Sequence, residues 1–151
     1  MKYFHRDITI HLGATCLATL DANRQRTRFH REIGGQLFAQ FVDSSLVVER
    51  ATCVKGVRSR FSFLPHRGEE QREIDALFRQ GLHYVGDWHT HPEGTPTPSG
   101  SDRTKMLEIF QQSKHQLPYM LMAIAGLEAF PDGLFLGVVE AGQIVQLWPR
   151  T

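Results

Sequence analysis

Residues 89–102 are the most constraining stretch of this chain, and they read HTHPEGTPTPSGSD. His89 and His91 stand two residues apart, and alternate residues of a β-strand point to the same face. Ser99 and Asp102 stand three residues apart, a spacing that shares one face of a helix. A strand, a loop and a helix start can therefore supply three nitrogen or oxygen ligands to one ion. Catalytic zinc sites use three protein ligands and leave a fourth position open for water, so the pattern indicates a hydrolase.

Each half of this stretch also has a purely structural explanation. Paired histidines on a strand often form a packed or hydrogen-bonded pair, and Ser99 with Asp102 fits a capping box at a helix start. The two halves together favour a metal site, because the loop between them is built to fix a chain path. The loop is built from Pro92, Gly94, Pro96 and Pro98, residues that fix a chain path rather than fill a core.

A hydrolytic metal site needs a carboxylate that moves a proton. Glu32 is the stronger candidate, because a charged residue there opens an otherwise apolar run, although a strand-end charge is the alternative explanation. Glu93 follows the second histidine too closely along a turning loop to be preferred. Asp87 shares the face of the histidines and is a candidate outer partner for an imidazole, with a solvated strand end as the alternative.

The composition is that of an ordinary globular protein, with 41% hydrophobic and 22% charged residues. The net charge of +1 gives no field that would recruit nucleic acid or a membrane. The start of the chain lacks the apolar core of a signal peptide, and the longest apolar run, 120–125, is far too short to span a membrane. We therefore expect one domain over residues 1–151 that acts in the cytoplasm.

Hydrophobic periodicity predicts an α/β fold, a single domain in which helices flank a mixed β-sheet. The expected helices are 13–23, 69–80 and 99–114. The expected strands are 7–12, 32–42, 46–54, 83–91, 119–125, 134–140 and 143–148. Residues 57–67 are expected to be irregular, and the aromatic Trp88 is expected to face the core, away from the histidines.

Two further groups of residues carry expectations. Cys16 and Cys53 lack a CxxC partner, and we expect both to be buried, reduced thiols. The segment 24–31 is basic, and a solvated loop or edge is the expected structure. A docking patch for an acidic partner is the alternative interpretation of that segment.

The pattern resembles the JAB/MPN (JAMM) metalloprotease family, whose signature is a distant glutamate followed by H-x-H-x7-S-x-x-D. The histidines, the serine and Asp102 fit this spacing without a gap, and the resemblance spans roughly residues 7–148. Glu32 opens EIGGQLFA, which is similar to the family's E-x-x-G-x-L-x-G except that Ala39 replaces the last glycine. The resemblance implies the MPN/JAB architecture, which is cytidine-deaminase-like.

The resemblance also implies the role of each site residue. His89, His91 and Asp102 would bind Zn2+, and Glu32 would hold and deprotonate the attacking water. Ser99 would donate a hydrogen bond to the developing oxyanion. Such family members cleave peptide or isopeptide bonds after the C-terminal tail of ubiquitin or a ubiquitin-like protein.

A narrower resemblance, carried by residues 84–93, is to short stand-alone bacterial members of this family. These occur in antiphage operons beside ubiquitin-activating-like and ubiquitin-conjugating-like proteins. Some reverse conjugation of a cyclic-oligonucleotide synthase (CBASS systems), and others act on a bacterial ubiquitin-like protein (Bil systems). The resemblance therefore implies a ubiquitin-like protein or conjugated target as substrate.

Three other functions are alternatives to a metalloprotease. A catalytically silent MPN scaffold would bind partners only, but such proteins typically lack a ligand, and this chain has the full set. Same-family processing of sulfur-carrier proteins shares the chemistry and differs in substrate. A zinc nucleobase deaminase would need a PCxxC pair, which Cys16 and Cys53 are too far apart to supply.

Overall fold

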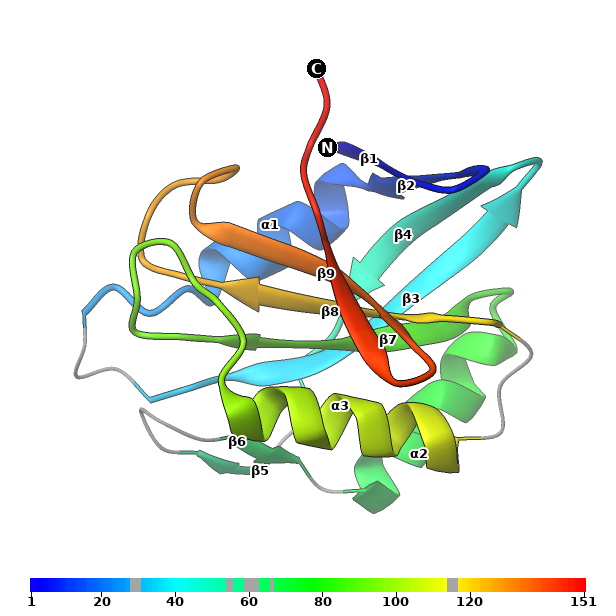
Figure 1. The fold of residues 1–151 in the computed structure, drawn as a ribbon. Coiled ribbons are helices and arrows are strands. Elements are labelled where there is room, and N and C mark those ends of the chain that lie inside the picture. Colours follow the sequence, from blue (N-terminus) through cyan, green and yellow to red (C-terminus); the bar gives the residue numbers. More distant parts are fainter. Residues whose placement is uncertain (28–30, 54–55, 59–62, 66, 114–116) are drawn as a thin grey trace.

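The structure is a computed structural model that describes residues 1–27, 31–53, 56–58, 63–65, 67–113 and 117–151 (Figure 1). Its centre is a mixed eight-stranded sheet with the strand order β1-β2-β4-β3-β7-β8-β9-β10. These strands are β1 (Lys2–His5), β2 (Ile8–Leu12), β3 (Gly34–Val42), β4 (Ser45–Ala51), β7 (His83–Thr90), β8 (Met120–Ala125), β9 (Leu134–Glu140) and β10 (Gln143–Leu147). The expected α/β fold with a mixed sheet is confirmed.

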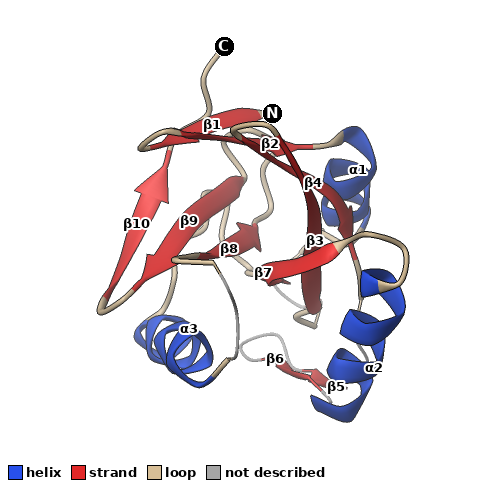
Figure 2. Cartoon of the chain, turned by 90° about the vertical axis from the view of Figure 1, so that its right-hand side faces the viewer, coloured by secondary structure: helices blue, strands red, loops and turns tan. Residues whose placement is uncertain are grey.

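Three helices and a small second sheet complete the described structure. The helices are α1 (Ala14–Ala22), α2 (Arg67–Phe78) and α3 (Gly100–Gln112), and the second sheet pairs β5 (Gly56–Arg58) with β6 (Phe63–Pro65). Viewed from the side, α3 and the β5–β6 pair lie below the central strands (Figure 2). Among the described residues, every helix is too short or too polar to cross a bilayer.

The central strands are buried on both faces, which explains their composition. All six residues of β8 are buried, and they alternate between two hydrophobic clusters. Leu121 and Ala123 belong to the larger cluster, which also contains Trp88 of β7. Met122 and Ile124 face the other way and pack with Met106 of α3. The sequence of a strand that is covered on both faces is a continuous apolar run, whereas apolar and polar residues alternate in a strand covered on one face.

Strand β7 lies at the centre of the sheet, antiparallel to β3 and parallel to β8. Trp88 is only 1% exposed and lies in the larger core, as predicted, so its neighbours Asp87 and His89 face the opposite side, which α3 covers. Gly86 interrupts the β3–β7 register with a φ of 155°, and a Cβ there would overlap the backbone of Leu121. Glycine is therefore required where β7 runs closest to β8.

Some expectations about the elements are wrong. Strand β1 was not expected, and 57–67 contains β6 and most of β5 rather than only irregular chain. Three- and four-residue strands are too short for a periodic signal. Phe78 follows Ile74 and Leu77 at helical spacing, a pattern typical of a buried stripe, but it ends α2 and is 63% exposed.

Two expectations about individual side chains also need correction. Cys16 is buried as predicted, but Cys53 is exposed, because it lies beyond the end of β4. In the basic segment, Arg26 and Arg31 are exposed as expected. Arg24, by contrast, has a side chain only 10% exposed. Residues 28–30 of that segment lie outside the described residues.

Candidate metal centre

The two histidines of the motif lie at the end of the central strand. His89 is the penultimate residue of β7, and His91 follows the strand directly. The backbone N–H of His91 donates to the carbonyl of Ala125, 3.0 Å away, so the parallel alignment with β8 continues past the strand end. His91 is 5% exposed. Both imidazoles are thus held by the most buried part of the sheet.

The carboxylate comes from the first turn of α3. Ser99 is the N-cap residue: its Oγ accepts a hydrogen bond from the backbone N–H of Asp102, 3.0 Å away. In return, Asp102 Oδ2 accepts from the backbone N–H of Ser99, 2.9 Å away. This is the capping box expected from the sequence. It turns the Asp102 carboxylate back over the helix start, toward the histidines.

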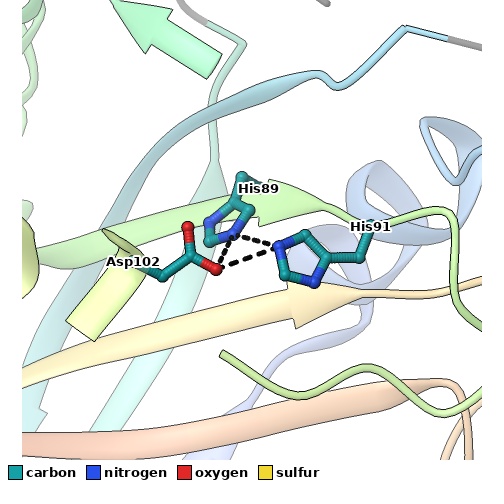
Figure 3. A group of neighbouring side chains, drawn as sticks. All are labelled: His89, His91 and Asp102. Carbon is teal, nitrogen blue, oxygen red and sulfur yellow. Dashed lines mark hydrogen bonds and ion pairs between the residues drawn. The ribbon is translucent and has the colours of Figure 1, made fainter. Parts of the chain in front are cut away.

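The three side chains converge on one point (Figure 3). The Nε2 atoms of His89 and His91 are 3.0 Å apart. Asp102 Oδ2 lies 3.3 Å from Nε2 of His89 and 3.0 Å from Nε2 of His91. Ligands at about 2.0–2.1 Å around a tetrahedral zinc ion are about 3.3 Å from one another. The donor set therefore fits a small tetrahedral cation in both chemistry and spacing.

Glu32 lies beside this cluster because of the pairing between β3 and β7. Gly34 pairs with His89, and Ile33 continues the register through hydrogen bonds with both the backbone and the hydroxyl of Thr90. The same register brings Glu32 opposite His91. The expected strand 32–42 thus begins two residues later, at Gly34. Glu32 occupies the extension that reaches the histidines.

The carboxyl group of Glu32 is strongly affected by this environment. Glu32 is 3% exposed, and burial raises its pKa to about 7. The charge of His91 opposes this shift, whereas the nearby carboxylates of Asp102 and Glu93 add to it. A buried carboxyl group with a pKa near neutrality is suited to accept and release a proton.

Within the cluster, burial and hydrogen bonds shift the pKa values of the three residues in different directions. Burial lowers the pKa of His89, which keeps this imidazole neutral. Burial also disfavours charge on His91, but the hydrogen bond and charge of Asp102, with the carboxylates of Glu32 and Glu93, raise its pKa overall. Although burial disfavours charge on Asp102 too, hydrogen bonds from both histidines hold its pKa well below the usual range. A divalent cation would therefore have to displace a proton from His91, the ligand whose pKa is raised.

Two acidic residues flank the cluster. The expected outer partner, Asp87, accepts a 2.8 Å hydrogen bond from the hydroxyl of Tyr84. Its role beside an imidazole stays a prediction. Glu93, which sequence reasoning passed over, lies with Oε1 3.4 Å from Nδ1 of His91. Nδ1 of His91 is buried and makes no hydrogen bond with the described residues. The ion-pair contact therefore makes Glu93 better placed than Asp87 to orient this ring.

A cavity of about 450 Å³ lies between α2 and α3. Its lining includes Gln36, Tyr84 and Asp87 from the sheet, Glu70 from α2, and Lys105 from α3. Lys105 was not singled out from the sequence, although it stands three residues after Asp102 and so shares its helix face. The charge of Lys105 acts on both Glu32 and His89, although none of the three ligands and neither Glu32 nor Ser99 is among the residues that line the cavity.

Comparison with known proteins agrees with the fold and the motif. Residues 19–133 match the family described as prokaryotic homologs of the JAB domain. This range covers most of the chain, which therefore belongs to that family. The resemblance to JAB/MPN proteins is confirmed.

Individual relatives carry names that describe hydrolases. The chain is 29% identical over 120 residues to a "CD-NTase/cGAS isopeptidase" of Pseudomonas aeruginosa, covering 76% of each protein. It is 31% identical over 124 residues to the "Probable metalloprotease y4qB" of Sinorhizobium fredii, again covering 76% of each. The solution structure of protein DSY2949 from Desulfitobacterium hafniense superposes with a TM-score of 0.64 at 19% identity, covering 91% of this chain and 88% of that one. This last similarity shows the shared fold.

Proposed function

We propose that the protein is a zinc-dependent isopeptidase. It would cleave after the C-terminal tail of a ubiquitin-like protein or of a similarly conjugated protein. The observation that carries this proposal is the convergence of His89, His91 and Asp102 beside the buried carboxyl of Glu32. Membership in the JAB family and the relative named as a probable metalloprotease support hydrolysis at a metal.

The residues divide the work of peptide hydrolysis between them. His89, His91 and Asp102 would hold zinc, which supplies a Lewis acid for the scissile carbonyl and acidifies water. Glu32 accepts the proton of the attacking water and passes it to the departing amine, which its raised pKa permits. Ser99 uses its Oγ lone pair in the capping box, so its O–H proton is left to donate to the oxyanion.

The substrate class is proposed from the relatives. One relative is named "CD-NTase/cGAS isopeptidase", and we propose for this chain a protein conjugated in a bacterial ubiquitin-like antiphage system. Ubiquitin-activating-like and ubiquitin-conjugating-like proteins of the same system would be its functional partners, and the cytoplasm its location.

The test measures bound metal and cleavage in the same preparations. Wild type is compared with Glu32→Gln and His89→Ala, and His83→Ala serves as the matched control because it changes a histidine on the same strand. The substrates are a ubiquitin-like protein, a CD-NTase and a sulfur-carrier protein, each fused through its C-terminus to a reporter. We expect wild type and His83→Ala to bind about one zinc ion and to cleave one of these fusions.

The two site variants should fail in different ways. His89→Ala should lose zinc, whereas Glu32→Gln should keep it and lose at least about 100-fold in kcat/KM. Equal cleavage by all four proteins would reject the proposal. Stoichiometric zinc without cleavage of any fusion would favour the silent scaffold, and cleavage of the sulfur-carrier fusion alone would change the substrate class.

A further inference from the structure

The loop that carries the second histidine is held from outside by another turn. The backbone N–H of Leu127 donates to the carbonyl of Glu93, 2.7 Å away, and that of Glu128 donates to the carbonyl of Gly94, 3.2 Å away. Gly126 lies so close to this loop that a Cβ would come within 2.5 Å of the Glu93 carbonyl. The turn of residues 126–133 therefore fixes the backbone path of the loop directly after His91.

One arginine from the N-terminal part of the chain, Arg24, binds the turn of residues 126–133. Nη1 of Arg24 donates to the carbonyl of Leu127, 2.8 Å away, and to that of Glu128, 2.6 Å away. The guanidinium carbon lies 5.7 Å from the centre of the Phe130 ring, and Nε is 2.7 Å from Oδ1 of Asp21. Its burial and its partners show that the Arg24 side chain makes specific contacts within the fold and is not simply a solvated charge.

These contacts form one path to the metal cluster. Arg24 holds the carbonyls of Leu127 and Glu128, whose N–H groups hold the backbone of Glu93 and Gly94. The side chain of Glu93 faces the outer nitrogen of His91. We propose that Arg24 is a positioning residue for the metal ligand His91, acting through this turn and Glu93.

The physical basis is the cost of ordering a loop. Each hydrogen bond along the path restricts the backbone that carries His91, so the ring is aimed before the ion arrives. Partners that orient a metal-binding histidine typically contribute about 10- to 100-fold in metal affinity. Arg24 acts one step further out, so we expect its loss to weaken zinc binding about 10-fold.

The first experiment measures zinc affinity by competition with a chelator. Arg24→Ala and Glu93→Gln should each raise the Kd for zinc, and Arg24→Lys, which keeps a donor and the charge, should restore most of the Arg24→Ala loss. The matched control is Arg150→Ala, because Arg150 also lies over an aromatic ring, that of Phe4, but at the β1 end of the sheet. An unchanged Kd in Arg24→Ala would overturn the proposal.

A double variant tests the path itself. If Arg24 acts through Glu93, the effect of Arg24→Ala with Glu93→Gln should be smaller than the product of the two single effects. Fully multiplicative effects would show that the two residues act separately, and would overturn this path. In an active enzyme, the loss should fall on kcat at limiting zinc and disappear at saturating zinc, which a general loss of folding would not do.

The inference rests on the proposed function only in naming zinc, so a second measurement is independent of metal. Amide hydrogen exchange in the metal-free protein should become faster at Leu127, Glu128 and His91 in Arg24→Ala, and stay unchanged there in Arg150→Ala. Unchanged exchange at all three amides would overturn the positioning role. Failure of wild type to bind zinc, with exchange faster in Arg24→Ala, would reject the proposed function and leave the positioning of His91 supported.

Discussion

Chemistry and stability place opposite demands on the single residue Glu32. Burial raises its pKa to about 7, from an ordinary value of 4.5. The folded protein therefore holds this proton more tightly than the unfolded chain does. The stabilisation that this provides is complete below the unfolded pKa and is lost as pH rises through the folded pKa. Above neutrality the metal-free protein keeps an ionised carboxylate in a buried position.

Glu32→Gln should therefore stabilise the metal-free protein in alkali. We expect a gain of about 1–3 kcal/mol near pH 8 and a much smaller change near pH 5, where Glu32 is already protonated in the fold. Urea unfolding in the presence of a chelator measures this. Glu108→Gln, on the exposed side of α3, is the control and should change little. A Glu32→Gln protein that is less stable than wild type near pH 8 would contradict the argument.

At the scale of the elements, strand β3 depends on one glycine. A Cβ at Gly35 would overlap the carbonyl group of Thr52, just beyond β4, and Thr52 also donates its N–H to the carbonyl of Gln36, 2.9 Å away. Adjacent glycines such as Gly34 and Gly35 are typical of a bulge or of a close backbone approach. The structure shows the close approach at Gly35, against protein backbone.

Gly35→Ala should force β3 away from the residues that follow β4. Because the clash is with backbone, relief requires movement of a strand, and we expect a loss of about 3 kcal/mol or more. Thermal and urea unfolding measure this loss. Gly100→Ala is the matched control, since a Cβ there meets open space and alanine favours the helix start of α3. Similar stability in the two variants would show that β3 has more freedom than its packing indicates.

The site was largely predictable from sequence because its ligands depend on local periodicity. His89 with His91 and Ser99 with Asp102 each share a face by spacing alone, and both ends belong to long, clearly patterned elements. The role of Arg24 was not predictable, because the carbonyls of Leu127 and Glu128 that it binds lie more than 100 residues away along the chain. The short strands β1, β5 and β6 were not predicted for a different reason. They form because neighbouring segments pair with them, and their own residue pattern does not indicate a strand.

At the scale of the whole molecule, the sheet curves until its two edges approach each other (Figure 2). A backbone bridge links Lys2 with Arg150. At the other end of β1, Nε2 of His5 is 2.7 Å from Oε1 of Glu140, and Arg6 reaches the same carboxylate at 3.1 Å. Closing the edges in this way covers strands that would otherwise be open to pairing with another chain.

Glu140→Gln should weaken this closure in a pH-dependent way. The hydrogen bond from His5 is the main factor that lowers the pKa of Glu140. Its stabilisation is therefore present above the unfolded pKa and lost as pH falls through the folded one. We expect a loss of about 1–3 kcal/mol near pH 7 that fades in strong acid, as measured by urea unfolding. A loss of equal size at every pH would point to packing instead of charge.

One oxygen atom, Oδ2 of Asp102, both completes the cap of α3 and faces the two imidazoles. An arriving ion would draw on the lone pairs that the first turn of the helix also uses. Metal binding and fraying of the first turn of α3 are then coupled. Binding of the ion should shift the NMR amide resonances of Ser99 and its neighbours even when no substrate is present.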